Sequence, residues 1–175
     1  MHELNTPFSP QTEATAYISV MLDFLEEIGI PTAEAENPAP SFVPGLAIVG
    51  GIIYYDRARM LYPGDLLHEA GHIAVTHPEE RPLSGTDELK GWPSDGDEIA
   101  TILWSFAAAR YLQIPLEVVF HENGYKGQSD WLIEQFESKT YIGLPLLEWM
   151  GLCNSAALAD DPDAPVFPNM IKWLR

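Results

Sequence analysis

The chain has 175 residues, 46% hydrophobic and 20% charged, which is typical of one globular domain with a core of its own. Its 26 acidic residues outnumber 9 basic ones and give a formal net charge of −17, so we expect no nucleic acid and no anionic membrane as a partner, because lysine and arginine bind phosphate groups. The single cysteine, Cys153, excludes an internal disulfide, and the sequence has neither a secretory signal nor a run of about 18 apolar residues, so we expect a cytoplasmic protein.

The first half of the chain is predicted to form a helix, a loop and a β-hairpin. Residues 1–9 are polar and are expected to be flexible, and apolar residues then recur at helical spacing from Thr12 to Ile28. Residues 31–44 contain four prolines and no helical pattern, so they are predicted to be a loop. Residues 45–56 are rich in β-forming side chains around Gly50-Gly51, a pair typical of a hairpin turn or of a close backbone approach within one longer strand.

The second half is predicted to be mainly helical. A helix of about 13 residues begins near Gly64 or Asp65, and either residue can cap it. The turn-rich residues 77–96 lead to a second helix over residues 97–112, which Pro115 ends. Shorter helical segments are expected over residues 116–121, 131–136 and 144–150. The tail, residues 166–175, is expected to dock on the body of the protein through Phe167, Ile171 and Trp173.

The most informative segment is His68-Glu69-Ala70-Gly71-His72, in which two histidines stand four residues apart. Residues at this spacing share one face of a helix, so both imidazoles can bind one divalent metal ion, and zinc accepts imidazole nitrogen in tetrahedral geometry. Glu69 is rotated by about 100° from His68 around the helix axis, so it can reach a water on the metal more easily than the metal itself. A glycine inside a helix costs about 1 kcal/mol relative to alanine, so Gly71 indicates close packing against neighbouring backbone. The simpler alternative is an ordinary helix with two surface histidines.

This segment resembles the active-site helix of the zincin metallopeptidases. The resemblance implies that His68 and His72 are metal ligands and that Glu69 is the general base. It also implies a β-hairpin or edge strand before the helix, which residues 45–56 can supply. The metzincin branch is excluded, because its pattern requires a histidine six residues after the second ligand, where this chain has Pro78.

The third ligand is expected from a following helix. A catalytic zinc site needs three protein ligands and an open position. The chain resembles the gluzincins and the ImmA/IrrE-type metallopeptidases, in which a glutamate on a later helix completes the site, and this implies Glu98, 26 residues after His72. Asp97 and Asp95 are the alternatives, either as the ligand or as acceptors for an imidazole N–H, and His121 is a further alternative for the third ligand. They can also simply cap the helix.

Further candidates lie in the predicted loop after residue 119. In zincins a histidine or tyrosine outside the ligand set often stabilises the oxyanion, and the resemblance implies this role for His121, Tyr125 or Tyr141. The simpler alternative is a turn with an exposed histidine. Asp65, one turn before Glu69, can support the site or serve only as a helix cap.

Residues 1–175 are therefore predicted to form a single α+β domain, a small zincin-like fold with a short hairpin or sheet beside several helices. The function expected is that of a zinc-dependent peptidase with one Zn²⁺ per chain and a peptide or protein substrate, in which Glu69 acts on a metal-activated water. Two alternatives remain: a non-catalytic protein-interaction module stabilised by the same metal, and an interaction domain without metal.

Overall fold

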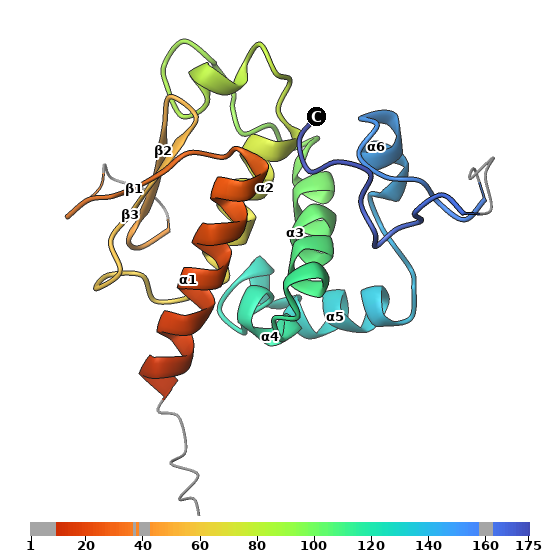
Figure 1. The fold of residues 1–175 in the computed structure, drawn as a ribbon, viewed down its shortest axis with the longest axis horizontal. Helices are drawn as coiled ribbons and strands as arrows, with labels where there is room; N and C mark the ends of the chain where they lie inside the picture. Colours follow the sequence, from red (N-terminus) through yellow and green to blue (C-terminus); the bar gives the residue numbers. More distant parts are fainter. Residues whose placement is uncertain (1–9, 37, 39–42, 158–162) are drawn as a thin grey trace, which may run out of the picture.

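The computed structural model describes residues 10–36, 38, 43–157 and 163–175. Within these residues the chain forms six α-helices and a small three-stranded sheet, which confirms the predicted α+β class. The sheet lies at one side of the molecule, and the helices make up the rest (Figure 1). The prediction that residues 1–9 are flexible falls outside the described residues.

The sheet combines one parallel and one antiparallel pair, in the order β1-β3-β2. Strands β2 (Leu46–Val49) and β3 (Ile52–Tyr55) form the predicted hairpin, and both glycines of the turn have positive φ, 63° at Gly50 and 74° at Gly51. Strand β1 (Thr32–Glu34) lies within the predicted loop and pairs in parallel with β3. The loop prediction was wrong there, because a three-residue strand formed by a distant partner leaves no local pattern.

Three helices form the centre of the molecule. Helix α1 (Pro10–Ile28) and helix α3 (Glu98–Leu112) both pack against α2 (Asp65–Val75), the helix that carries the two histidines (Figure 1). Helix α2 begins at the predicted place, and most of its residues are buried. Helix α3 was predicted to bury one side, but its residues from Ala100 to Ala109 are buried except for Ile102, because α2, α4 and α6 all contact it.

Gly71 lies in close contact with α3. A Cβ atom at this position would lie 2.9 Å from Thr101 Cγ2 and 3.1 Å from the Thr101 carbonyl oxygen. These distances are shorter than the roughly 3.5–4.0 Å of an ordinary carbon contact. The predicted packing reason for this glycine is thereby confirmed, and the neighbour is the helix that carries Glu98.

The remaining elements cover the far end and the side of α3. Helices α4 (Leu116–Val119), α5 (Ser129–Glu137) and α6 (Leu144–Trp149) agree with the predicted short helices to within a few residues, and two 3-10 turns, η1 (Arg81–Leu83) and η2 (Tyr125–Gly127), lie in the loops. In the tail, Phe167 is buried and Trp173 packs on Trp104, but Ile171 is 51% exposed. The prediction that Ile171 anchors the tail was therefore wrong. The backbone N–H of Arg175 donates to the carbonyl of Ala74, which ties the tail to the end of α2.

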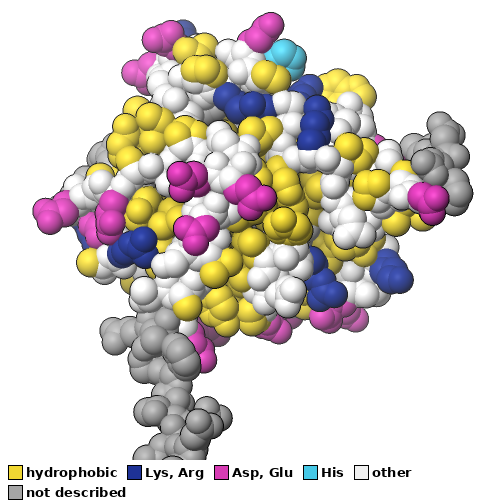
Figure 2. Space-filling view, viewed as in Figure 1, with side chains coloured by type: hydrophobic (Ala, Val, Ile, Leu, Met, Phe, Trp, Pro, Cys, Tyr) yellow, Lys and Arg dark blue, Asp and Glu magenta, His cyan; other side chains and the backbone are white. Residues whose placement is uncertain are grey.

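On the face drawn in Figure 2, carboxylate side chains lie scattered among hydrophobic and basic ones. None of the helices in the described part of the chain has the length and apolar character needed to cross a membrane.

Candidate metal centre

Helices α2 and α3 bring three side chains together, and these are positioned to hold a metal ion. His68 and His72 project from one face of α2, and Glu98, the first residue of α3, faces them. The Nε2 atoms of the two histidines lie 3.2 Å apart. Glu98 Oε1 lies 3.6 Å from Nε2 of His68, and Oε2 lies 3.4 Å from Nε2 of His72.

These separations fit a tetrahedral zinc site. With metal–ligand bonds of about 2.05 Å, two ligands of a tetrahedral ion lie about 3.3–3.4 Å apart. The three separations in the structure, 3.2, 3.4 and 3.6 Å, bracket that value. Two imidazole nitrogens and a carboxylate are also a donor set that zinc accepts. The residues present therefore fit a zinc ion, although other divalent metals accept the same donors.

Both histidines are neutral, which is the form that binds a metal. Burial, together with the neighbouring His72 and His121, lowers the pKa of His68 to about 3. Burial likewise lowers the pKa of His72 to about 4. The side chain of Glu98 is 42% exposed, whereas those of the histidines are 18% and 6% exposed. The ligand set is thus buried on the side of α2 and open to solvent on the side of Glu98.

Glu69 lies beside the ligands and is not one of them. Burial, with the nearby carboxylates of Asp65 and Glu98, raises the pKa of Glu69 to about 7. Among the described residues no hydrogen bond is formed by its carboxylate. A carboxylate whose pKa lies near neutrality is suited to accept and return a proton, because both of its protonation states are populated.

Each of the two histidines has a hydroxyl group close to Nδ1, the ring nitrogen that does not face Glu98. Nδ1 of His68 lies 3.5 Å from the hydroxyl of Tyr125, and Nδ1 of His72 lies 3.3 Å from Oγ1 of Thr101. Burial, followed by the nearby carboxylates of Asp65, Glu98 and Glu69, raises the pKa of Tyr125 above its usual value, so its hydroxyl stays protonated. Thr101 is fully buried and stands on α3, three residues after Glu98.

His121 forms a separate pair with Asp65. Its Nε2 lies 2.9 Å from Oδ1 of Asp65, and its ring stacks on Tyr62 with 3.8 Å between ring centroids. Its Nδ1 is buried and has no hydrogen-bond partner in the described part of the chain. His121 is therefore not the exposed histidine of the simpler alternative. A role in oxyanion stabilisation stays a prediction.

The helix caps suggested by the sequence are confirmed for Gly64 and, in position only, for Asp97. Gly64, not Asp65, is the N-cap of α2, because Asp65 is already helical and its carboxylate faces His121. Asp97 is the N-cap of α3, but its side chain does not cap the helix and accepts a hydrogen bond from Ser94 at 2.8 Å. Asp97 and the exposed Asp95 are absent from the ligand group, which within the described residues contains Glu98 as its third member.

Tyr141 and His77 also lie apart from the ligand set. Tyr141 packs against Phe106 and Phe167, with ring centroids 5.9 and 4.6 Å away. His77 is exposed just after the end of α2. Neither side chain belongs to the group that can hold a metal.

Sequence reasoning missed the polar stripe of α3. Glu98, Thr101 and Ser105 stand at positions i, i+3 and i+7, which share one helical face. Thr101 faces His72, and the Ser105 hydroxyl contacts the carbonyl of Leu67 at 3.3 Å. The sequence did contain a signal for them, because polar residues line one face of an otherwise apolar, alanine-rich helix. Buried polar groups need hydrogen-bond partners, so such a face indicates contact with other polar groups.

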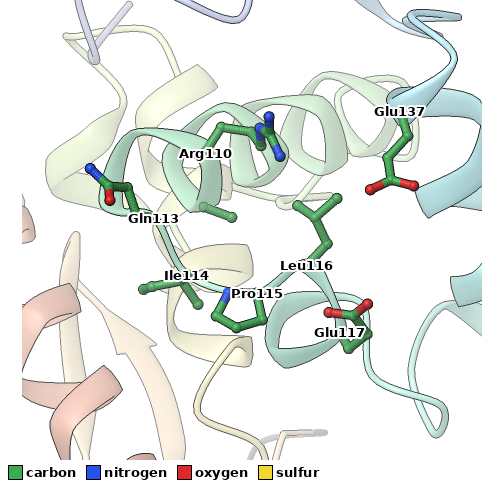
Figure 3. A pocket seen from close by; sticks show the side chains of 8 residues that line it. Arg110, Gln113, Ile114, Pro115, Leu116, Glu117 and Glu137 are labelled. Carbon is green, nitrogen blue, oxygen red and sulfur yellow. The ribbon is translucent and has the colours of Figure 1, made fainter.

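A surface cavity of about 460 Å³ lies at the other end of α3 (Figure 3). Arg110 of α3, Glu117 of α4 and Glu137 of α5 line it together with apolar residues near Pro115. Glu98 and Arg110 are 12 positions apart, which corresponds to about 18 Å along a helix. The cavity is therefore separate from the metal centre.

No protein-family model, curated protein or solved structure matches this chain. A proposed function therefore rests on the three candidate ligands, their spacing and the neighbouring carboxylate of Glu69.

Proposed function

We propose that the chain is a zinc-dependent metallopeptidase that hydrolyses peptide or protein substrates. The observation that supports this most strongly is the spacing of His68, His72 and Glu98, which matches the ligand separations of tetrahedral zinc. The carboxylate of Glu69, with a pKa raised to about 7, lies on the same helix. This pairing of a metal site with a proton acceptor favours hydrolysis over metal binding alone.

The number of ligands also favours a catalytic centre. Structural zinc sites usually have four protein ligands, whereas catalytic sites have three and an open position. Among the described residues the group contains three candidate ligands, and the Glu98 side of it is open to solvent. A purely structural site would be expected to include a fourth histidine, cysteine or carboxylate.

In the proposed reaction Glu69 first accepts a proton and later donates it. His68, His72 and Glu98 would hold a zinc ion, which as a Lewis acid would make a water more acidic and polarise a carbonyl oxygen. The Glu69 carboxylate removes a proton from the attacking water as the new C–O bond forms at the peptide carbonyl carbon. It then delivers that proton to the amide nitrogen as the C–N bond breaks, so the products are a carboxylic acid and an amine.

The test separates metal binding from hydrolysis. Glu69→Gln removes the proton acceptor and keeps the size of the side chain, so it is expected to abolish cleavage of a mixed peptide library, read by mass spectrometry, and to retain zinc. His72→Ala is expected to lose both. Glu79→Gln makes the same chemical change at an exposed position and should alter neither.

Three results would contradict the proposal. Untagged protein that takes up less than about 0.2 zinc per chain would exclude the metal centre. Unchanged cleavage by Glu69→Gln would exclude its role as the base. Zinc binding by the parent without cleavage of any peptide would instead favour the non-catalytic, metal-stabilised interaction module.

A further inference from the structure

We infer that Tyr125 and Thr101 are positioning residues that orient the two metal-binding histidines, each through one hydroxyl group. This inference rests on the proposed metal centre and goes beyond it, because it assigns the partners of the ligands and not the ligands themselves. The hydroxyl of Tyr125 lies 3.5 Å from Nδ1 of His68, and that of Thr101 lies 3.3 Å from Nδ1 of His72.

The protonation of the two rings leads to this assignment. Both Nε2 atoms face the Glu98 carboxylate, so both must present a lone pair to the same ion. A neutral imidazole carries one proton, and that proton must then be on Nδ1. Each buried Nδ1–H needs an acceptor, and the structure offers one hydroxyl oxygen to each ring. The two hydroxyls thus select the tautomer that leaves Nε2 free for the metal.

Tyr125 is held firmly enough to act in this way. Its backbone has a positive φ of 53°, followed by 56° at Lys126 and 77° at Gly127, a left-handed run that turns its side chain inward toward α2. Its ring packs against Phe120 at 5.1 Å and against the ring of His68 at 5.5 Å, nearly perpendicular to it. The hydroxyl is therefore fixed beside the ligand by packing on two sides.

The segment that carries Tyr125 is also attached to α2 itself. His121 contacts Asp65, three residues before His68 on the same helix, and the hydroxyl of Ser129 donates to the His121 carbonyl at 2.6 Å. Two contacts, His121 with Asp65 and Tyr125 with His68, thus connect this segment to α2. The His121–Asp65 pair therefore helps to hold the segment that carries Tyr125 against α2.

Thr101 couples the second histidine to the third ligand. Thr101 and Glu98 are three residues apart on α3, so they share the helical face that meets α2. Gly71 leaves the space that lets the Thr101 side chain and backbone approach α2. One helix therefore supplies both a ligand and the partner of another ligand.

The test removes one oxygen atom at a time. Tyr125→Phe and Thr101→Val are each expected to weaken zinc affinity by about 10- to 100-fold, measured by competition with a chromophoric chelator, because loss of such partners typically has this effect. Thr101→Ser keeps the hydroxyl and should restore affinity to near that of the parent. Tyr111→Phe makes the same change at an exposed position near the far end of α3 and should leave affinity unchanged.

A spectroscopic readout separates orientation from loss of stability. In long-range ¹H–¹⁵N spectra of the zinc-loaded protein, Tyr125→Phe should shift the Nδ1–H signal of His68 and speed its exchange with solvent, while that of His72 stays unchanged. Thr101→Val should do the reverse. A general loss of stability would affect both histidines together.

The possible results are distinguishable. If the parent binds no zinc, the metal centre itself is wrong, and the positioning role fails with it. If the parent binds zinc and both variants keep its affinity within about twofold, the positioning role alone is refuted. If Tyr125→Phe keeps parent affinity and loses cleavage, Tyr125 is an oxyanion donor, which also overturns the inference.

Discussion

Gly71 offers the sharpest test of how the two helices form the metal centre. Replacing it with alanine adds one methyl group at a position where Thr101 Cγ2 would be 2.9 Å away and the Thr101 carbonyl oxygen 3.1 Å away. Restoring an ordinary contact of about 3.5 Å requires a local separation of α2 and α3 by roughly 0.5 Å. Thr101 cannot turn aside easily, because it is fully buried.

Two opposing terms determine the effect of this change on stability. Alanine in a helix interior is favoured over glycine by about 1 kcal/mol. Overpacking of a well-packed core typically costs about 1–3 kcal/mol. The free energy of unfolding is therefore expected to fall by about 0–2 kcal/mol.

Metal affinity should be affected more than stability. Glu98 stands on α3, and its oxygens lie 3.4 and 3.6 Å from the histidine nitrogens of α2. Coordination distances tolerate deviations of only about 0.2 Å, so a shift of about 0.5 Å between the helices should weaken zinc binding by about 10-fold or more.

The experiment compares Gly71→Ala with Gly96→Ala. Gly96 precedes α3, and the nearest atom to an added Cβ there is Ser94 Oγ at 3.7 Å, so this control has room for the methyl group. Urea denaturation with chelator present gives the stability of the metal-free protein, and competition with a chelator gives zinc affinity. A Gly71→Ala protein that is about 1 kcal/mol more stable than the parent and binds zinc equally well would refute the reasoning.

Four further predictions concern Glu98, Cys153 and Arg175. Glu98→Ala should weaken zinc affinity by about 10-fold or more, and Asp97→Ala by less, because only Glu98 is in the ligand group. Burial raises the pKa of the Cys153 thiol to about 12. At pH 8 the thiolate fraction of Cys153 should therefore be roughly a thousandfold lower in the folded than in the unfolded protein. A thiol reagent should then label Cys153 only after denaturation. The same shift favours the folded protein below about pH 8.5, and this stabilisation should be lost as the pH rises above that value, which urea denaturation of the parent and of Cys153→Ala from pH 7 to 10 can measure. Arg175→Ala removes a guanidinium that donates to the last carbonyl of α2 and lies 4.6 Å from the ring centroid of Trp149, so it should lower the free energy of unfolding by about 1 kcal/mol in urea.

Each of these predictions has a contrary result. Equal zinc affinities for the Glu98 and Asp97 variants would remove the reason for choosing Glu98 as the third ligand. Rapid labelling of Cys153 in the folded protein would show that the thiol is accessible. An unchanged urea midpoint for Arg175→Ala would mean that the guanidinium adds nothing to the other contacts that hold the tail, among them the backbone contact with Ala74 and the packing of Trp173 on Trp104.

The sequence alone determined the parts of the site that lie within one helical repeat. His68 and His72 share a face of α2 because four residues nearly complete one turn, and this holds for any helix that includes them. Gly71 was recognised as a packing position because glycine is unfavourable inside a helix. The hairpin was likewise predicted from a glycine pair between two β-rich segments, since its turn and pairing are local.

Only the tertiary structure decided which distant groups complete the site. Glu98, Asp97 and Asp95 all lie near the start of α3, and the fold of the long connection from α2 determines which carboxylate faces the histidines. Thr101 and Tyr125 reach the histidines from other elements. Helical periodicity relates residues a few positions apart, whereas contacts between separate elements depend on packing. The local pattern therefore identified two candidate ligands, and the packing of α2 against α3 placed the third candidate beside them.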